Sequence, residues 1–222
     1  MNKKFTIFAL AMFSTFAVKA QQVISDDVSL GESNDVFYNL SNQGKTTYDR
    51  NSWDLSFYVK DSRSAVIRVN DALGTKVYEA SNNISDWNNI DITNINSWNE
   101  LYNSDTTWNN GAFSNGSAQY GWGEYNMANH VVYGSVIFVL KYSDNSYIKL
   151  KINNLTYGIY NLTYSEWDAS NKVWLDDVTR SVDSSSSSNT NFIYYSFIND
   201  EKVTSEPAKD EWDLKFTKYT TP

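Results

Sequence analysis

The sequence predicts an all-β protein, an antiparallel β-sandwich or meander with long loops, and three observations support this prediction. Apolar and polar residues alternate over short stretches, while helical periodicity is poor. The 222 residues include eight Trp, 16 Tyr and 11 Phe, which are residue types that strands favour. A phrase also occurs twice, with its two Trp-Asp-Leu strands 159 residues apart. Such a repeat indicates a duplicated β-module.

The first twenty residues have the pattern of an export signal. Lys3 and Lys4 precede an apolar run over residues 5–18, and Val18-Lys19-Ala20 places small residues at the two positions that a signal peptidase reads. The run is too short to span a bilayer, and the chain has no cysteine for a lipid anchor or a disulfide. We expect cleavage before Gln21 and an exported protein, at the cell surface or extracellular, that is not transmembrane.

The charge balance excludes two classes of partner. Loss of the three lysines in the predicted signal takes the formal charge from −8 to −11. An acidic chain of this kind is not expected to bind nucleic acid or an anionic membrane surface.

The first predicted strand covers residues 53–59, where Trp53, Leu55 and Phe57 share one face. A short apolar run at 65–69 follows. Residues 131–142 are apolar on both faces, which is typical of a central strand covered on both sides. A turn at 144–146 leads to an alternating strand at 147–152, and residues 157–164 form the third strand of this meander.

Two segments lack a steady period. Residues 81–129 are rich in Asn, Ser, Asp, Trp and Gly, so we expect long loops with one helical turn near 97–102. A 49-residue insertion of this kind is usually functional or poorly ordered. Residues 181–190 include five consecutive serines and are predicted to be a flexible linker.

The repeated phrase sets the expected domain organisation. The first copy covers residues 37–45 and continues to Trp53-Asp54-Leu55, and the second covers residues 194–202 and continues to Trp212-Asp213-Leu214. We expect a first β-module over 21–180 and the start of an incomplete second repeat over 191–222. The Trp53-Asp54 and Trp212-Asp213 pairs are predicted to be structural, each with a buried Trp beside an exposed Asp.

The ordered motifs resemble one known family. The opening phrase, the strand at 136–139 followed by Asp144, and Tyr157-Gly158 followed by Leu162-Thr163-Tyr164 resemble the HmuY family of exported haem-binding proteins of Bacteroidetes. The resemblance covers most of residues 28–165 and implies an HmuY-like all-β fold. It also implies haem capture for iron acquisition at the cell surface and delivery to an outer-membrane haem receptor.

The resemblance does not transfer an iron ligand by position. A well-known member holds iron between two histidines, and the matching position here is near Gly123. Residues 21–222 contain one histidine, His130, and one methionine, Met127, and both residue types bind haem iron. Because axial ligands approach from opposite faces, at most one of them is expected to bind iron, with a tyrosine, another module or a second protein as partner. Alternatively, His130 is an ordinary loop histidine and Met127 fills a gap.

Aromatic residues gather just before this pair. Within residues 108–125 they alternate with glycines, and rings on such a loop can flank a porphyrin or stack on a sugar. The ligand-stacking candidates are Trp108, Phe113, Tyr120, Trp122 and Tyr125. The alternative is that these rings only attach loops to the sandwich. A non-catalytic glycan-binding module and a structural or adhesive surface module therefore stay open as alternative functions.

Enzyme chemistry is not indicated. The chain has no cysteine nucleophile, and its one histidine has no surrounding motif that would build a catalytic triad. Apart from the possible haem iron, no metal or phosphate motif of recognised spacing occurs.

Overall fold

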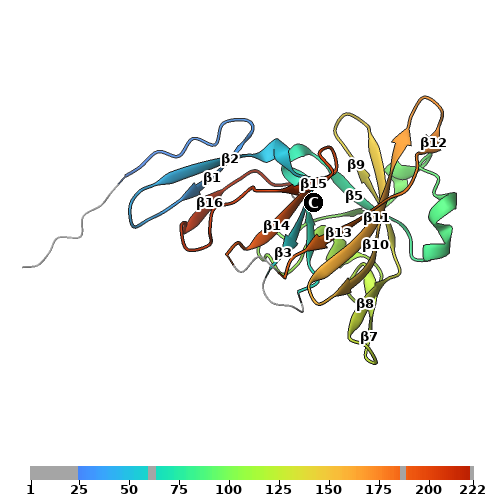
Figure 1. Ribbon diagram of the computed structural model, residues 1–222. Helices are drawn as coiled ribbons and strands as arrows, with labels where there is room; N and C mark the ends of the chain where they lie inside the picture. The colour runs from blue at the N-terminus through green and yellow to red at the C-terminus, as the bar shows by residue number, and fades with distance from the viewer. Residues whose placement is uncertain (1–24, 60–63, 186–188, 221–222) are drawn as a thin grey trace, which may run out of the picture.

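The computed structural model describes residues 25–59, 64–185 and 189–220, and it confirms an all-β fold with antiparallel pairing (Figure 1). The predicted signal peptide, residues 1–20, lies outside the described residues. The helical elements are short 3₁₀ turns: η1 (Arg50–Ser52), η2 (Asp71–Leu73), η3 (Ile84–Asn89), η4 (Ile95–Ser97) and η5 (Ala112–Asn115).

The strands form three sheets. The large sheet contains β5 (Lys76–Ser81), β6 (Glu100–Leu101), β7 (Gly123–Asn126), β8 (Val131–Gly134), β9 (Ile137–Lys141), β10 (Tyr147–Thr156), β11 (Ile159–Asp168), β12 (Val173–Trp174) and β13 (Val178–Asp183). The four-stranded sheet has the order β15 (Glu201–Val203), β14 (Phe192–Ser196), β3 (Leu55–Tyr58), β4 (Ile67–Val69). The three-stranded sheet has the order β16 (Leu214–Phe216), β1 (Asn34–Tyr38), β2 (Lys45–Asp49).

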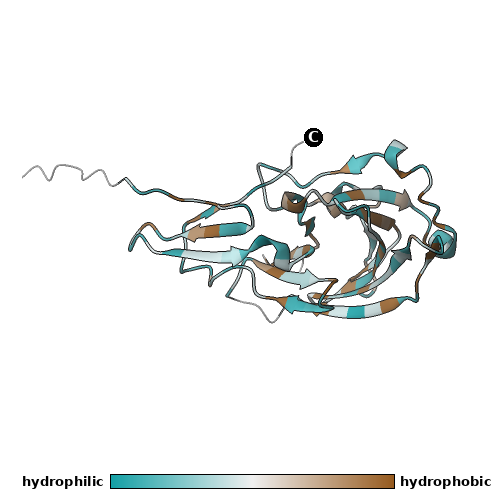
Figure 2. Ribbon diagram, turned by 90° about the horizontal axis from the view of Figure 1, so that it is seen from above, coloured by the Kyte–Doolittle hydropathy of each residue, from teal (hydrophilic) through white to brown (hydrophobic). Residues whose placement is uncertain are grey.

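The main core lies between the large sheet and the four-stranded sheet, as expected for a sandwich. Phe57 of β3 meets Tyr160 of β11 with ring centroids 4.7 Å apart. Figure 2 shows hydrophobic and hydrophilic residues alternating along several strands, the pattern from which the strands were predicted.

The predicted strand over residues 131–142 is two strands. The backbone N–H groups of Ser135 and Val136 donate to the carbonyl of Trp122 and leave the ladder, so β8 and β9 are separate. The prediction of burial on both faces is confirmed for β9, where Phe138 belongs to the main core and Val139 to a second cluster under η3 and η4.

The irregular insertion contains short elements that the sequence did not predict. The helical turn expected near 97–102 is wrong, because η4 ends at Ser97 and residues 100–101 form β6, which pairs with β5. In the predicted linker, residues 181–183 belong to β13 and pair with β11, and residues 186–188 lie outside the described part. The turn at 144–146 is confirmed between β9 and β10.

The two copies of the phrase exchange strands. β3 of the first copy pairs with β14 of the second, while β16 of the second pairs with β1 of the first. The registers are equivalent: Leu55 faces Tyr195 just as Leu214 faces Tyr38. The second copy is therefore no separate body in this structure, although its origin as the start of a further module stays a prediction.

The Trp-Asp pairs of the two copies make matching contacts. Trp53 packs against Tyr194 with centroids 5.0 Å apart, and Trp212 packs against Phe37, the equivalent residue, at 4.9 Å. Each aspartate also accepts a backbone N–H from the other copy; these contacts are Phe197 N to Asp54 Oδ2 at 2.6 Å and Leu40 N to Asp213 Oδ2 at 2.7 Å. These pairs therefore join the two halves.

Candidate functional site

His130 and Met127, the predicted iron ligands, lie at the tip of the β7–β8 hairpin, which projects from the large sheet (Figure 1). The Met127 side chain is 83% exposed, so it fills no gap in the core. His130 is also exposed and adopts a left-handed backbone conformation with φ 58°. Because its backbone N–H donates to the carbonyl of Asn126 at 2.9 Å, the turn that holds both residues is closed.

A tyrosine contacts the histidine directly. The Tyr125 hydroxyl lies 2.5 Å from Nδ1 of His130, which is hydrogen-bond distance. Tyr120 lies beside Tyr125, with ring centroids 6.4 Å apart. Both tyrosines are 36% exposed. We call Tyr120, Tyr125, Met127 and His130 the hairpin cluster, and it unites four of the predicted site residues on one surface.

Tyr157, which was not among the predicted site residues, follows β10, the strand that pairs with β8 of the hairpin. The register between β8 and β10 reaches Val132 opposite Leu155, so two further residues lead to His130 on one strand and to Tyr157 on the other. The Tyr157 side chain is 80% exposed, in the turn between β10 and β11. Gly158 is the sequence signal for this turn, where Tyr157 and Gly158 both have positive φ.

The remaining aromatic candidates, Phe113, Trp122 and Trp108, lie in different parts of the structure. Phe113 and Trp122 are fully buried; Phe113 packs on Phe138, and the indole of Trp122 donates to the carbonyl of Ala65 at 2.8 Å. Because both rings are buried, neither offers a face to a ligand. The prediction that Phe113 and Trp122 stack on a bound ligand therefore does not fit this structure. Attachment of the loop to the sandwich, the stated alternative, accounts for both. Trp108 lies elsewhere, at a cleft.

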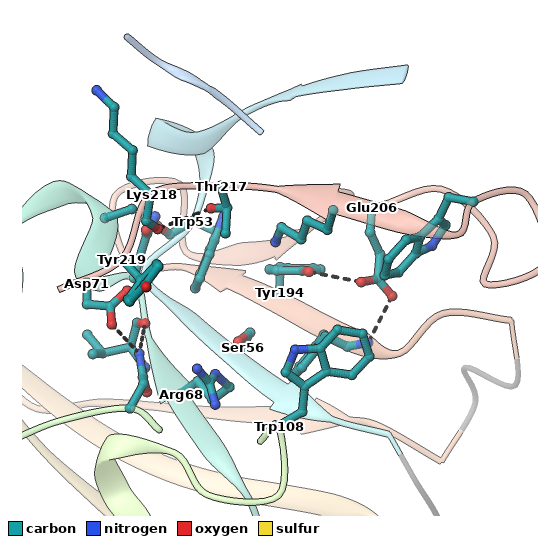
Figure 3. Close-up of a pocket in the computed structure, with 17 residues that line it drawn as sticks. Trp53, Ser56, Arg68, Asp71, Trp108, Tyr194, Glu206, Thr217, Lys218 and Tyr219 are labelled. Atoms are coloured by element: carbon teal, nitrogen blue, oxygen red, sulfur yellow. Dashed lines mark hydrogen bonds between the residues drawn. The ribbon is translucent and has the colours of Figure 1, made fainter. Parts of the chain in front are cut away.

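This cleft lies between the four-stranded and three-stranded sheets, where the two copies meet, and we call it the seam cleft (Figure 3). Its inner cavity measures about 100 Å³, and an adjoining groove measures about 520 Å³. The residues that line both are Arg68, Asp71, Asn103, Trp108, Thr217 and Tyr219. Sequence reasoning missed this cleft because its walls come from segments about 150 residues apart.

A buried carboxylate, Glu206, and a half-buried guanidinium, Arg68, border the seam cleft. One oxygen of Glu206 accepts from the backbone N–H of Phe192 at 3.0 Å, and the other accepts from the Tyr194 hydroxyl at 3.0 Å. Burial raises the pKa of Glu206 despite these bonds. Burial lowers the pKa of Arg68, whose guanidinium donates to backbone carbonyls of the loop that carries Trp108.

Three buried polar atoms of cleft-lining residues have no hydrogen-bond partner: Nε1 of Trp53, Nε1 of Trp212 and Oδ1 of Asn70. Trp53 is 8% exposed and Asn70 is 1% exposed. Unsatisfied buried donors and acceptors are uncommon in folded proteins, and water or a ligand is the usual explanation for them.

Within residues 25–59, 64–185 and 189–220, no group of three or more His, Cys, Asp or Glu side chains is arranged to hold a metal ion. No helix in the same ranges is long and apolar enough to cross a membrane. No protein-family model, curated protein or solved structure matches this chain.

Proposed function

We propose that the protein is an exported haem-binding protein for haem and iron acquisition, and that the hairpin cluster holds the haem. The observation that carries this proposal is the 2.5 Å contact between Tyr125 and His130 on an exposed hairpin tip. A histidine that binds iron through one ring nitrogen generally donates its other ring N–H to a fixed partner. Here Tyr125 is that partner for Nδ1, which leaves Nε2 of His130 for iron.

The same pair also supports the reverse assignment. In this assignment Nδ1 of His130 accepts a hydrogen bond from the Tyr125 hydroxyl, and the oxygen of Tyr125 would bind the iron, as tyrosine does in some haem proteins. Bound haem would supply an iron that takes axial ligands and a flat apolar face. In either assignment the rings of Tyr120 and Tyr125 offer the porphyrin an aromatic surface.

The surroundings of the cluster supply a second contact. Tyr157, in the turn of the neighbouring β10–β11 hairpin, would supply the second contact to the haem. Met127 is the alternative ligand, since its thioether is exposed at the same tip. An outer-membrane haem receptor is the proposed acceptor of the haem.

A hemin titration followed in the Soret and Q bands tests the proposal. We expect a saturable, shifted Soret band in the wild type that His130→Ala changes. If Tyr125→Phe retains the wild-type band with weaker binding, His130 is the ligand; if it removes a phenolate charge-transfer band, Tyr125 is the ligand. Met127→Ala and Tyr157→Phe assign the second contact in the same way.

Tyr219→Phe is the matched control, because Tyr219 is an exposed tyrosine at the seam cleft. Its spectrum should equal that of the wild type. Zinc protoporphyrin should bind as well, because apolar burial and not the acidic surface is expected to supply the affinity. A spectrum identical to that of free hemin would contradict the proposal and favour the structural or adhesive reading.

A further inference from the structure

We propose that the seam cleft is a second binding site, which takes a neutral, hydroxyl-rich ligand of the size of one sugar unit. The site shares no residue with the hairpin cluster and is independent of haem binding. The proposal rests on the shape of the cavity, an exposed tryptophan, unpaired polar atoms, and the engagement of Arg68 and Lys215 within the protein.

A short side chain, Ser56, lies in the inner cavity of the cleft. Ser56 lies in β3 between Arg68 of β4 and Tyr194 of β14, and Figure 3 shows it on the floor of the cleft. The equivalent residue of the other copy is Lys215, which pairs with Phe37. The inner cavity beside Ser56 measures about 100 Å³, room for about three waters at ~30 Å³ each or for one hydroxymethyl group.

Trp108 forms one wall and is 41% exposed. Its ring is held by Phe192 at 5.6 Å and by Trp212 at 6.1 Å between centroids. A tryptophan fixed in this way offers an apolar ring face at little entropic cost, and the apolar C–H face of a sugar ring can pack on it. The adjoining groove of about 520 Å³ has the size of a small-molecule site.

The unpaired polar atoms match hydroxyl groups. The two indole N–H groups of Trp53 and Trp212 are donors, and Oδ1 of Asn70 is an acceptor. These atoms have almost no accessible surface, so a ligand reaches them only when the surrounding side chains move. A hydroxyl both donates and accepts, so it is the uncharged group that suits atoms of both kinds.

Two of the three cations that line the cleft are engaged within the protein, and the third, Lys218, is exposed to solvent. The guanidinium of Arg68 donates to the carbonyls of Ser104, Thr107 and Asn110 at 2.9 to 3.1 Å. The ammonium of Lys215 pairs with Asp35 at 3.1 Å. Since these cations are engaged within the protein, a carboxylate or phosphate on the ligand gains little from them.

The test uses the indole N–H signals of ¹⁵N-labelled protein, assigned with Trp53→Phe and Trp212→Phe. The probes are the neutral trisaccharides maltotriose, cellotriose, mannotriose and chitotriose, with trigalacturonate as an anionic probe. We expect at least one neutral probe to shift the signals of Trp53 and Trp212 in a saturable way. Trp108→Ala should weaken that binding on the order of tenfold, because the stacking surface is lost.

Trp167→Ala is the matched control, since Trp167 packs on Trp174 in the large sheet, outside the seam cleft. It should leave saccharide binding unchanged, and Trp108→Ala should leave the hemin spectrum unchanged, so the two proposed sites fail or succeed separately. The inference is overturned if no neutral probe shifts the two signals, which would leave water as the occupant. It is also overturned if trigalacturonate alone binds, or if Trp108→Ala binds as well as wild type.

Discussion

The two Trp-Asp-Leu segments share their three residues and pair with equivalent strands of the other copy, but their surroundings are very different. In the first copy Asp54 is 6% exposed and Leu55 is fully buried, whereas in the second Asp213 is exposed and Leu214 is 43% exposed. The prediction of a buried Trp beside an exposed Asp is therefore confirmed for Trp53 and Asp213, whereas Asp54 is buried and Trp212 is half-buried.

The difference comes from the neighbouring strands. β3 lies between β14 and β4 and faces the main core, whereas β16 is at the edge of its sheet. The pairing register and the reciprocal backbone bonds are local and occur in both copies. Burial depends on what covers the strand, so identical residues contribute unequally to stability.

The largest expected difference is at the leucines. Leu55→Ala should lower the free energy of unfolding by about 3 kcal/mol, because it removes buried methyl groups and leaves a cavity. Leu214→Ala should cost about 1 kcal/mol or less, since that side chain already contacts water. Urea unfolding followed by circular dichroism measures both, and equal losses would refute the comparison.

The aspartates should differ less. Asp54→Ala leaves the Phe197 N–H and the Tyr142 hydroxyl without their acceptor, and about 2 kcal/mol of stability should be lost. Asp213→Ala exposes the Leu40 N–H to water and should cost about 0.5 kcal/mol. Asp54→Asn keeps one acceptor oxygen and should be milder than Asp54→Ala in the same urea experiment. The reverse order for these two variants would show that burying the charge outweighs the two bonds.

The smallest expected effect is a pH dependence of stability that arises at the turn of the second copy and not at the turn of the first. Asp200 and the equivalent Gln43 both have positive φ. Only Asp200 is ionisable, and its bond from Arg180, followed by that from Tyr195, lowers its pKa from 3.8 to about 2. Because the folded pKa is below the unfolded one, this stabilisation is present above pH 3.8 and is lost as the pH falls toward 2.

Thermal unfolding measured at a series of pH values between pH 5 and pH 2 tests this pH dependence of stability. Asp200→Asn should flatten the acid-side loss of stability relative to wild type. Gln43→Asn is the control, since it changes no charge at the equivalent turn. If wild type and Asp200→Asn lose stability in parallel down to pH 2, Asp200 is not the group responsible.

The sequence by itself determined the local features of this protein. Alternation over residues 53–59 and 147–152 predicted strands, and Asp144-Asn145-Ser146 predicted the turn between β9 and β10. Period-two alternation and turn residues act within a few positions, so they can be read without knowledge of the neighbours. The repeated phrase likewise predicted two similar β-strand units.

Only the tertiary structure decided which strands are neighbours and which rings are enclosed. The exchange of β3 and β16 between the copies, the break between β8 and β9, and the burial of Trp122 all depend on contacts far apart in the chain. Trp108 and Trp122 lie in the same aromatic window, yet one lines the seam cleft and the other is in the core. Their different environments result from long-range strand pairing and from packing against other strands. Neither of these can be predicted from a local sequence pattern.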